Sequence, residues 1–517
     1  MISKSQNGNF IVGAHIGMAI ILGFLPKVVQ IWSWTRQSQP DTCSDEKMSQ
    51  EAPKATPDIL LNDGRPQIDG QIHPFEYYYK PGMKLRPAPA RTESSPAWKP
   101  VRERLLSPLM RVDHEPRRTE LVQKLEDHFW QGDELMDAVI DLGHRIGLGA
   151  VRKMVTTALS SGIESLSNPP PEILALFSQL DSVPAWFTPE EFEHGRVVFS
   201  NASWFGSISS LIINKALTAQ AEPIASAVGA TGQYTSKTTK AQIRRHLETT
   251  HFFARVPRPG GWKRYSETFQ EIVKVRFMHC QVRYLLKKRW GKDHFERSGM
   301  PISSTDMAHG LVTFGVQRLI CDGVFGIRYA TADLDAVVRF WGYIGYIFGV
   351  AEEIIPHDFD DAVTIVDFLL SSDGTPSPYG PDIVKSFDTF GRELRGEGKT
   401  LLGRFANRLN QRFIHGLTYF ILGDVLGPRQ VATANYSKPY LRLLSFASAV
   451  VAKLAICIMA LKDCLPGRAG RMQERARLGD PFEEYVESLS GELMKKYELK
   501  ATFEAHDAHS VGDFREN

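Results

Sequence analysis

His279 is set within a helical pattern, EIVKVRFMHCQVRYLLKKRW (residues 271–290). At 100° per residue it shares a face with four aliphatic side chains, and Arg276 and Arg283 lie along one edge of that face. A neutral imidazole on a buried face needs partners for both ring nitrogens. The pattern alone leaves two interpretations open: a core histidine bonded to a carbonyl oxygen, or a ligand to a metal ion or haem iron.

Upstream, the segment AQIRRHLETTHFF (241–253) places a guanidinium and a hydroxyl on one apolar helix face. Arg245 and Thr249 are four residues apart on that face. Such a pair can bind an oxygen species or a carboxylate. The alternative is structural, with an internal salt bridge for the arginine and a threonine bonded back to its own helix. His246 and His251 project about 100° or more from this face and are weaker ligand candidates.

Helical periodicity dominates the chain from Arg117 onward, and alternating patterns long enough for strands are nearly absent. We therefore expect a mostly α fold without internal repeats. In SVPAWFTPEEFEHGRVVF, Thr188 is expected to cap a helix that begins at Pro189. Further helices are predicted at residues 205–230, 237–254, 266–290, 303–321, 331–350, 358–371, 382–395, 401–410 and 440–463.

Composition excludes several classes of protein. The 517 residues include 61 Lys and Arg against 59 Asp and Glu, so no overall field favours nucleic acid as a partner. The five cysteines form no CxxC pair and no zinc spacing with histidine, which argues against a disulfide framework. One of them, Cys321, is interpreted as a buried core thiol rather than a haem thiolate ligand.

Two apolar segments suggest contact with a membrane. NFIVGAHIGMAIILGFL (9–25) carries no charge and, extended by PKVVQIW, is long enough to span a bilayer, so residues 1–34 are predicted to form a retained membrane anchor. Positive charge is denser after this segment than before it, which favours a cytosolic catalytic portion. The second segment, residues 443–461, contains one charge, Lys453, and is expected to be a core helix or to lie in the membrane plane.

Composition also divides the chain into parts. Residues 35–116 are rich in proline and polar side chains and are predicted to form an arm or linker, with HPFEYYYKPG (73–82) packed onto the body. A helical part is expected at 117–179 and a catalytic domain at 180–430. Residues 431–517 are expected to hold the second apolar helix and a polar tail.

The order Arg245-x3-Thr249, followed by His279 in HCQVR, resembles the oxygenase family that joins latex-clearing proteins to the mycophenolic acid oxygenase MpaB. The resemblance covers about residues 180–425. Two positions depart from the latex-clearing members: Glu248 stands where they carry lysine, and Gly229 stands near the place of their glutamate. The acid–base part of a rubber-type mechanism is therefore not transferred. Four flanking stretches also agree with the family: VPAWFTPEEFEHGRVVFS (183–200), GATGQ (229–233), GMPISSTDMAHGLVTFG (299–315) and RFWGYIGYIFGVAEEIIPHDFDDA (339–362).

The resemblance implies a haem b protein with a globin-like helical core that uses O₂. His279 would be the proximal iron ligand, and Arg245 and Thr249 would lie on the distal side. Helical phase adds that Arg276 and Arg283 could pair with the haem propionates. The implied reaction is oxidative cleavage of a C=C bond in a lipophilic, isoprenoid-type substrate. The expected location is the endoplasmic reticulum membrane, with the catalytic part facing the cytosol.

Two alternatives remain open from the sequence. The first keeps the haem but makes the protein a hydroxylase, an oxidase or a peroxidase-like enzyme of secondary metabolism. The second is a non-catalytic helical membrane protein that binds haem or lipid or scaffolds a partner. In that case Arg245, Thr249 and His279 would only form hydrogen bonds in the core.

Overall fold

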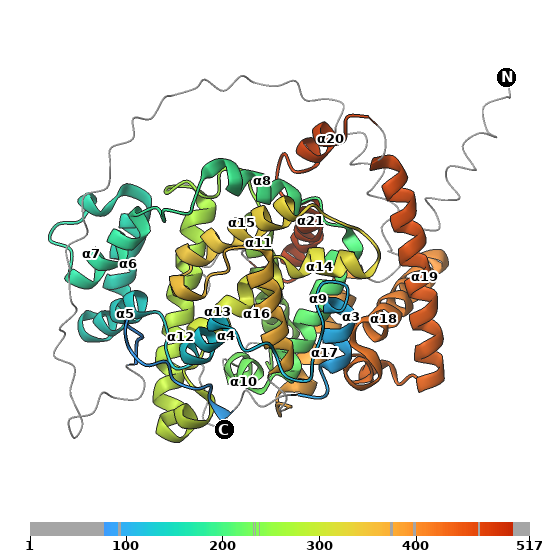
Figure 1. The fold of residues 1–517 in the computed structure, drawn as a ribbon, viewed down its shortest axis with the longest axis horizontal. Coiled ribbons are helices and arrows are strands. Elements are labelled where there is room, and N and C mark those ends of the chain that lie inside the picture. Colours follow the sequence, from blue (N-terminus) through green and yellow to red (C-terminus); the bar gives the residue numbers. More distant parts are fainter. Residues whose placement is uncertain are drawn as a thin grey trace.

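The computed structural model describes residues 77–499, except for 91–94, 231, 233, 237, 373–375, 397–399 and 464–465. Every regular element in these residues is helical, which confirms the predicted mostly α class. The predicted membrane anchor lies outside the described residues, and the globin-like character of the core stays a prediction. In Figure 1, α5 to α7 lie at one side of the central helices, and α18 and α19 lie at the other.

The α-helices follow one another through the whole described part of the chain. In order they are α3 (Lys99–Leu106), α4 (Glu120–His128), α5 (Glu134–Ile146), α6 (Leu148–Ser161), α7 (Pro171–Asp181), α8 (Pro189–Phe199), α9 (Trp204–Gln220), α10 (Glu222–Ala230), α11 (Thr239–Arg255), α12 (Glu267–Ser298), α13 (Ser304–Phe314), α14 (Gln317–Val324), α15 (Thr331–Ile347), α16 (Phe359–Ser371), α17 (Gly380–Arg395), α18 (Leu401–Gln430), α19 (Lys438–Asp463), α20 (Arg468–Arg475) and α21 (Pro481–Lys496).

Local sequence signals explain where several helices begin and end. The Thr188 side chain accepts a hydrogen bond from the Glu191 N–H and Pro189 opens α8, as predicted. The helix predicted at 303–321 is divided into α13 and α14 at Gly315. A Cβ at this glycine would lie 2.6 Å from the Trp341 ring, so only glycine permits this packing.

Part of the segment before residue 116, which was predicted to be an arm or linker, packs into the core. Trp98 and Leu105, in and beside α3, are buried in the main hydrophobic cluster. The Arg102 guanidinium donates to Oδ1 of Asp367 on α16 at 2.8 and 3.0 Å, and both residues are buried. The proline-rich composition gave no sign of this packing, because a few large buried side chains are enough to hold the segment against the core.

The tyrosines at the start of the described chain pack onto the body, as predicted. Tyr77 donates to Asp127 at 2.7 Å, and Tyr78 donates to Asp137 at 3.2 Å. The backbone N–H of Tyr79 donates to Gln131 at 2.7 Å. These bonds hold residues 77–79 against α4 and the start of α5.

The segment after residue 430 is joined to the helical core by buried ion pairs. Arg318 on α14 forms a buried ion pair with Glu483 at 2.7 Å and a second with Asp480, at the start of α21. Burial raises the pKa of Glu483 to about 7, although Arg318 opposes this shift. The last described helix is therefore tied to the centre of the fold by buried charges.

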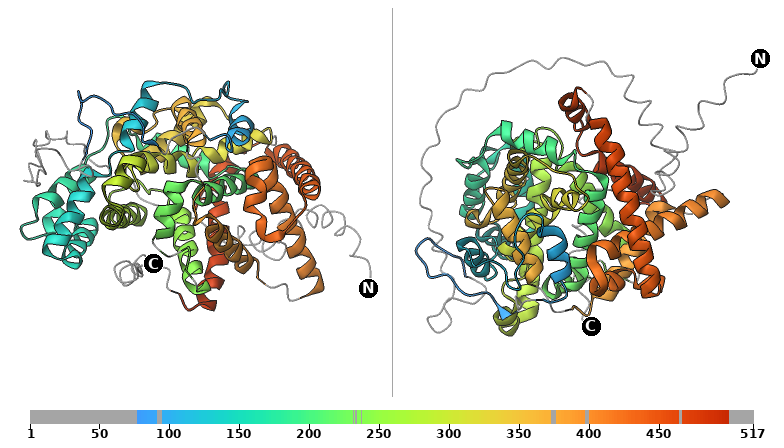
Figure 2. Two further views of the ribbon diagram at one scale, coloured as in Figure 1. Left: turned by 90° about the horizontal axis from the view of Figure 1, so that it is seen from below. Right: turned by 45° about the vertical axis from the view of Figure 1, so that its right-hand side comes forward.

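One helix in the described part of the chain, Lys438–Ile458 within α19, is long and apolar enough to cross a membrane. Only 28% of its apolar window is buried, so the expectation of an ordinary core helix is not met. α19 lies along α18 on the outside of the molecule (Figure 2).

We predict that Trp98→Ala lowers the free energy of unfolding by about 3–5 kcal/mol, because it leaves a cavity in the core. Leu109→Ala is the control: this side chain is 41% exposed, and its loss should cost less than about 1 kcal/mol. Urea unfolding of both variants measures the difference. If both variants lose the same small amount of unfolding free energy, residues 95–110 do not belong to the core.

Candidate functional site

His279 lies near the middle of α12, where Met307 and Phe348 but also the charged Asp133 line the same small cavity. The helix is started by Ser266, whose side chain accepts a hydrogen bond from the Phe269 N–H. The imidazole is half-buried, and its ring centroid is 5.5 Å from that of Phe348, which directly follows α15. The sequence prediction of a histidine on a mainly apolar face is thus confirmed in its geometry.

Arg276 and Arg283 are buried on either side of His279, and both point toward the segment that begins α5. Arg276 donates to the two carboxylate oxygens of Asp133 at 2.5 and 2.8 Å, and also to Gln179 and a backbone carbonyl. Arg283 donates to Asp137 at 2.6 Å and to the carbonyls of residues 301 and 302. The structure therefore gives both arginines a role in holding α12 in place.

These bonds keep both arginines charged. Burial acts to lower the pKa of the Arg276 and Arg283 guanidinium groups, but Asp133 and Asp137 outweigh it and the pKa of each is raised. Burial also raises the pKa of the neighbouring Cys280 thiol, which makes it unreactive. Pairing with haem propionates, which no observation tests, would have to compete with these carboxylates.

Arg245 and Thr249 share a face of α11, as predicted, and their side chains contact each other. The Arg245 Nη1 donates to Thr249 Oγ1 at 3.1 Å, and the threonine hydroxyl donates back to the Arg245 carbonyl at 3.2 Å. The Tyr234 hydroxyl lies 3.4 Å from Thr249 Oγ1, and its ring faces the guanidinium carbon at 5.5 Å. Glu248 is 3.9 Å from Arg245. The contacts expected for a structural role are present, while the Arg245 side chain keeps 21% of its surface exposed.

Phe348 joins the α11 and α12 parts of the site. Its ring centroid lies 5.9 Å from that of Phe252, which shares a face of α11 with Arg245, and 5.5 Å from His279. Beside it, Phe253 stacks on Phe314 of α13 at 4.2 Å. The structure thus links α11 and α12 through Phe348, an aromatic contact that the sequence did not reveal. Phe348 was missed because nothing marks it among the aromatic residues of α15.

The residues around His279 fit a haem better than a bare metal ion. No group of three or more His, Cys, Asp or Glu side chains that could hold a metal occurs between residues 77 and 499 where the structure is described. A porphyrin needs only one protein ligand in apolar surroundings. Met307 and Gly310 of α13 are half-buried, and a Cβ added at Gly310 would meet no atom within 4 Å. Open space is therefore present on the face of α13 that carries Met307.

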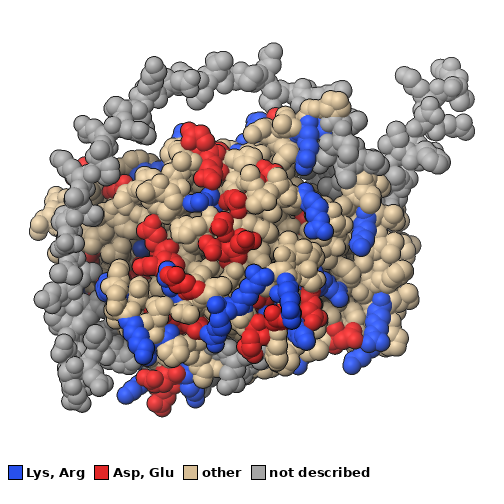
Figure 3. All heavy atoms as spheres, viewed as in Figure 1, with Lys and Arg blue, Asp and Glu red and all other residues tan. Residues whose placement is uncertain are grey.

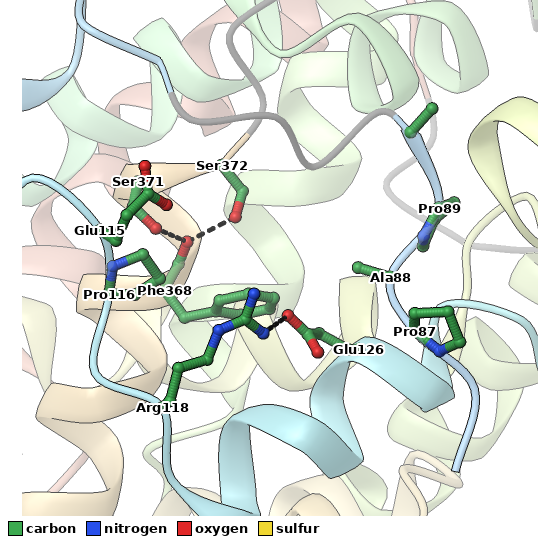
Figure 4. Close-up of a pocket in the computed structure, with 11 residues that line it drawn as sticks. Pro87, Ala88, Pro89, Glu115, Pro116, Arg118, Glu126, Phe368, Ser371 and Ser372 are labelled. Carbon is green, nitrogen blue, oxygen red and sulfur yellow. Dashed lines mark hydrogen bonds and ion pairs between the residues drawn. The ribbon is translucent and has the colours of Figure 1, made fainter.

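Cavity volumes limit where a flat cofactor could lie. The cavity between His279, Asp133 and Gly349 measures about 10 Å³, enough for about one water molecule. A macrocycle would have to approach the imidazole from another side. A cavity of about 350 Å³ lies elsewhere and includes none of the predicted site residues (Figure 4). Its polar lining residues are Glu115, Arg118, Glu126, Ser371 and Ser372.

His246 is excluded as a ligand of the site. Its ring is buried, stacks on Phe390 at 4.6 Å and lies 3.1 Å from the Ser386 hydroxyl. Burial, and next the charge of Arg245, lower its pKa to about 3. His246 therefore anchors α11 against α17, which fixes the position of the adjacent Arg245.

Comparison with known proteins identifies the segment that holds these residues. Residues 198–434 match the family described as "ER-bound oxygenase mpaB/B'/Rubber oxygenase, catalytic domain". This segment is similar to the catalytic domain of that family. The match includes Arg245, Thr249 and His279, and it confirms the resemblance that the sequence motifs indicated.

Two individual proteins are similar to the chain. The rubber oxygenase of Streptomyces sp. (strain K30) is 25% identical over 251 residues, which are 46% of this chain and 57% of the relative. The match thus spans little more than half the length of that relative. A solved structure of latex clearing protein LCP in the closed state gives a TM-score of 0.46 at 18% identity, and the match covers 68% of this chain and 89% of that one.

We predict that the burial of His246 makes unfolding depend on pH. Its pKa is lower in the folded chain than its ordinary value of 6.5, so the unfolded chain binds the extra proton and stability falls as the pH drops below 6.5. Between pH 7 and pH 5 this loss amounts to about 2 kcal/mol, which His246→Phe should remove. Urea unfolding at both pH values measures it, with the exposed His357→Phe as control. An unchanged pH dependence in His246→Phe would contradict the assignment.

Proposed function

We propose that the protein is a haem b-dependent oxygenase that cleaves a C=C bond of a lipophilic, isoprenoid-type substrate with O₂. The observation that carries the proposal is that one oxygenase-family segment contains Arg245, Thr249 and His279, and that their two helices meet at Phe348. Cleavage of the double bond by one O₂ molecule gives two carbonyl groups. Both oxygen atoms enter the products, so no further reductant is required.

His279 is the proposed protein ligand of the haem iron, and a bound haem would supply the centre that activates O₂. The chain's own contribution is to fix the imidazole. Arg276 and Arg283, three residues before and four after His279, tie α12 to Asp133 and Asp137. This leaves the helix little freedom to turn His279 away from Phe348.

Arg245 is the proposed electrostatic group. Its guanidinium is positioned by Thr249 Oγ1 at 3.1 Å, so it is oriented before the substrates arrive. It would stabilise negative charge that develops on a reacting oxygen atom, in a site where water is scarce. Thr249 acts as a positioning residue, and Tyr234 supports it from the other side.

The side chains around these groups favour an apolar substrate. Phe252, Phe253, Phe314 and Phe348 form the contacts between α11, α13 and α15. Aromatic surfaces of this kind bind hydrocarbon chains and exclude water. The acid–base group of the reaction is not assigned, because Gly229 stands near the place of the glutamate of the latex-clearing members.

We predict that His279→Ala abolishes the Soret band of the purified, haem-supplemented chain, because the iron loses its protein ligand. His251→Gln, a histidine change on α11 outside this face, should leave the band at full strength. Absorption spectra with and without dithionite measure both variants, and circular dichroism confirms that each is folded. A full Soret band in folded His279→Ala would reject the ligand assignment.

We predict that Arg245→Ala retains haem but lowers turnover about a hundredfold, as for loss of a single charge-stabilising donor. Arg244→Ala, its neighbour on α11, is the matched control and should keep most of the activity. Mass spectrometry of products from a polyisoprenoid substrate measures turnover and identifies the reaction. Two carbonyl fragments support cleavage, whereas a product with one added oxygen would replace this proposal with a hydroxylase. Undiminished turnover in Arg245→Ala would remove this residue from the mechanism.

A further inference from the structure

The outer face of α19 is apolar and uncovered within the described structure. Five large side chains on it are between 40% and 71% exposed: Leu443, Phe446, Val450, Leu454 and Ile458. Their spacing of three or four residues places them in one stripe along the helix, about 22 Å long. Single exposed apolar residues are ordinary, but a continuous stripe of this length marks an interaction surface.

Packing against α18 keeps this stripe turned outward. The opposite face of α19 is buried, with Leu441, Ala452 and Ala455 among its residues. The Ser448 hydroxyl donates to the Phe413 carbonyl of α18 at 3.0 Å. A Cβ at Gly416 of α18 would lie 2.4 Å from the Leu444 carbonyl oxygen, so the two helices are in close backbone contact. α19 therefore cannot rotate to bury its outer face without losing these contacts.

The first turns of α18 carry a second exposed apolar group beside a row of arginines. Leu401, Leu402 and Phe405 are each more than half exposed. Arg404, Arg408 and Arg412 are also exposed and follow one another at four-residue steps along the same helix. Figure 2 shows these turns projecting from the body near α19.

Charge in this region differs from the rest of the chain. Residues 401–462 contain eight Lys and Arg but one acidic residue, Asp424. The rest of the chain has 53 basic and 58 acidic residues. The right-hand edge of the molecule in Figure 3, where α19 lies, is mostly tan and shows more blue than red.

We propose that α18 and α19 form a docking surface that lies in the plane of an anionic lipid membrane. The stripe of α19 and the apolar residues of α18 enter the boundary between headgroups and acyl chains, while the arginines and lysines contact lipid phosphates. A true span is disfavoured because one face of α19 is committed to α18 and Lys453 lies on the exposed face. A second copy of the chain is disfavoured because two like-charged surfaces repel. This surface is independent of the proposed oxygenase chemistry.

The test places an environment-sensitive NBD fluorophore on the full-length chain, with Cys43, Cys457 and Cys464 replaced by serine. One variant carries the label at Phe446→Cys, and the control carries it at Val183→Cys, an exposed apolar position far from α19 in the sequence. Vesicles contain phosphatidylcholine alone or with phosphatidylserine, and doxyl-labelled lipid acts as quencher. A membrane anchor elsewhere in the chain would bring both labels near the vesicle. A difference between the labels at 446 and 183 therefore reports membrane contact by α19 itself.

The proposal predicts that the label at 446 shifts to the blue and is quenched several-fold more than the label at 183 in phosphatidylserine vesicles. Quenching should fall several-fold in phosphatidylcholine alone and when Arg404, Arg408 and Arg412 are changed together to glutamine. Emission at 446 equal to that at 183 would overturn the proposal. A blue shift without quenching by lipid would also overturn it, since protein would then cover the stripe. Equal quenching in both kinds of vesicle would overturn the role assigned to the charges.

Discussion

Two buried ion pairs beside His279 hold the helix that carries the candidate site. A buried charge left without its partner costs about 3–5 kcal/mol, so Asp133 must meet Arg276 and Asp137 must meet Arg283 in the same fold. Each pair joins the middle of α12 to the segment that starts α5. Together they fix both the position and the rotation of the helix that carries His279.

Each ion pair leaves no room for a side chain at a neighbouring glycine. Gly349 has a φ of +80°, and a Cβ there would lie 2.3 Å from an Asp133 carboxylate oxygen and 2.4 Å from Arg276 Nε. A Cβ at Gly132 would lie 2.5 Å from Asp137 and 2.8 Å from Arg283. Phe348, which precedes Gly349, is thereby held against His279. The aromatic contact that links α11 and α12 thus depends on charges buried beside His279.

Most of the helices could be predicted from the sequence, because they rest on local periodicity, whereas Arg245, Thr249 and His279 remain predicted site residues. Thr188 and Pro189 marked the start of a helix through capping chemistry alone. The roles of Arg276 and Arg283 could not be predicted in this way, since their partners are 143 and 146 residues distant. Composition likewise placed a linker before residue 116, although Trp98 is only 1% exposed in the core.

The most direct test of the account is chemical rescue of the proposed ligand. Haemin is titrated into folded His279→Gly, with and without free imidazole, and the Soret band is followed. If the imidazole of His279 is the ligand, the variant binds no stoichiometric haem alone, and added imidazole restores the band. Stoichiometric binding without imidazole, equal to that of the unaltered chain, would contradict the central claim.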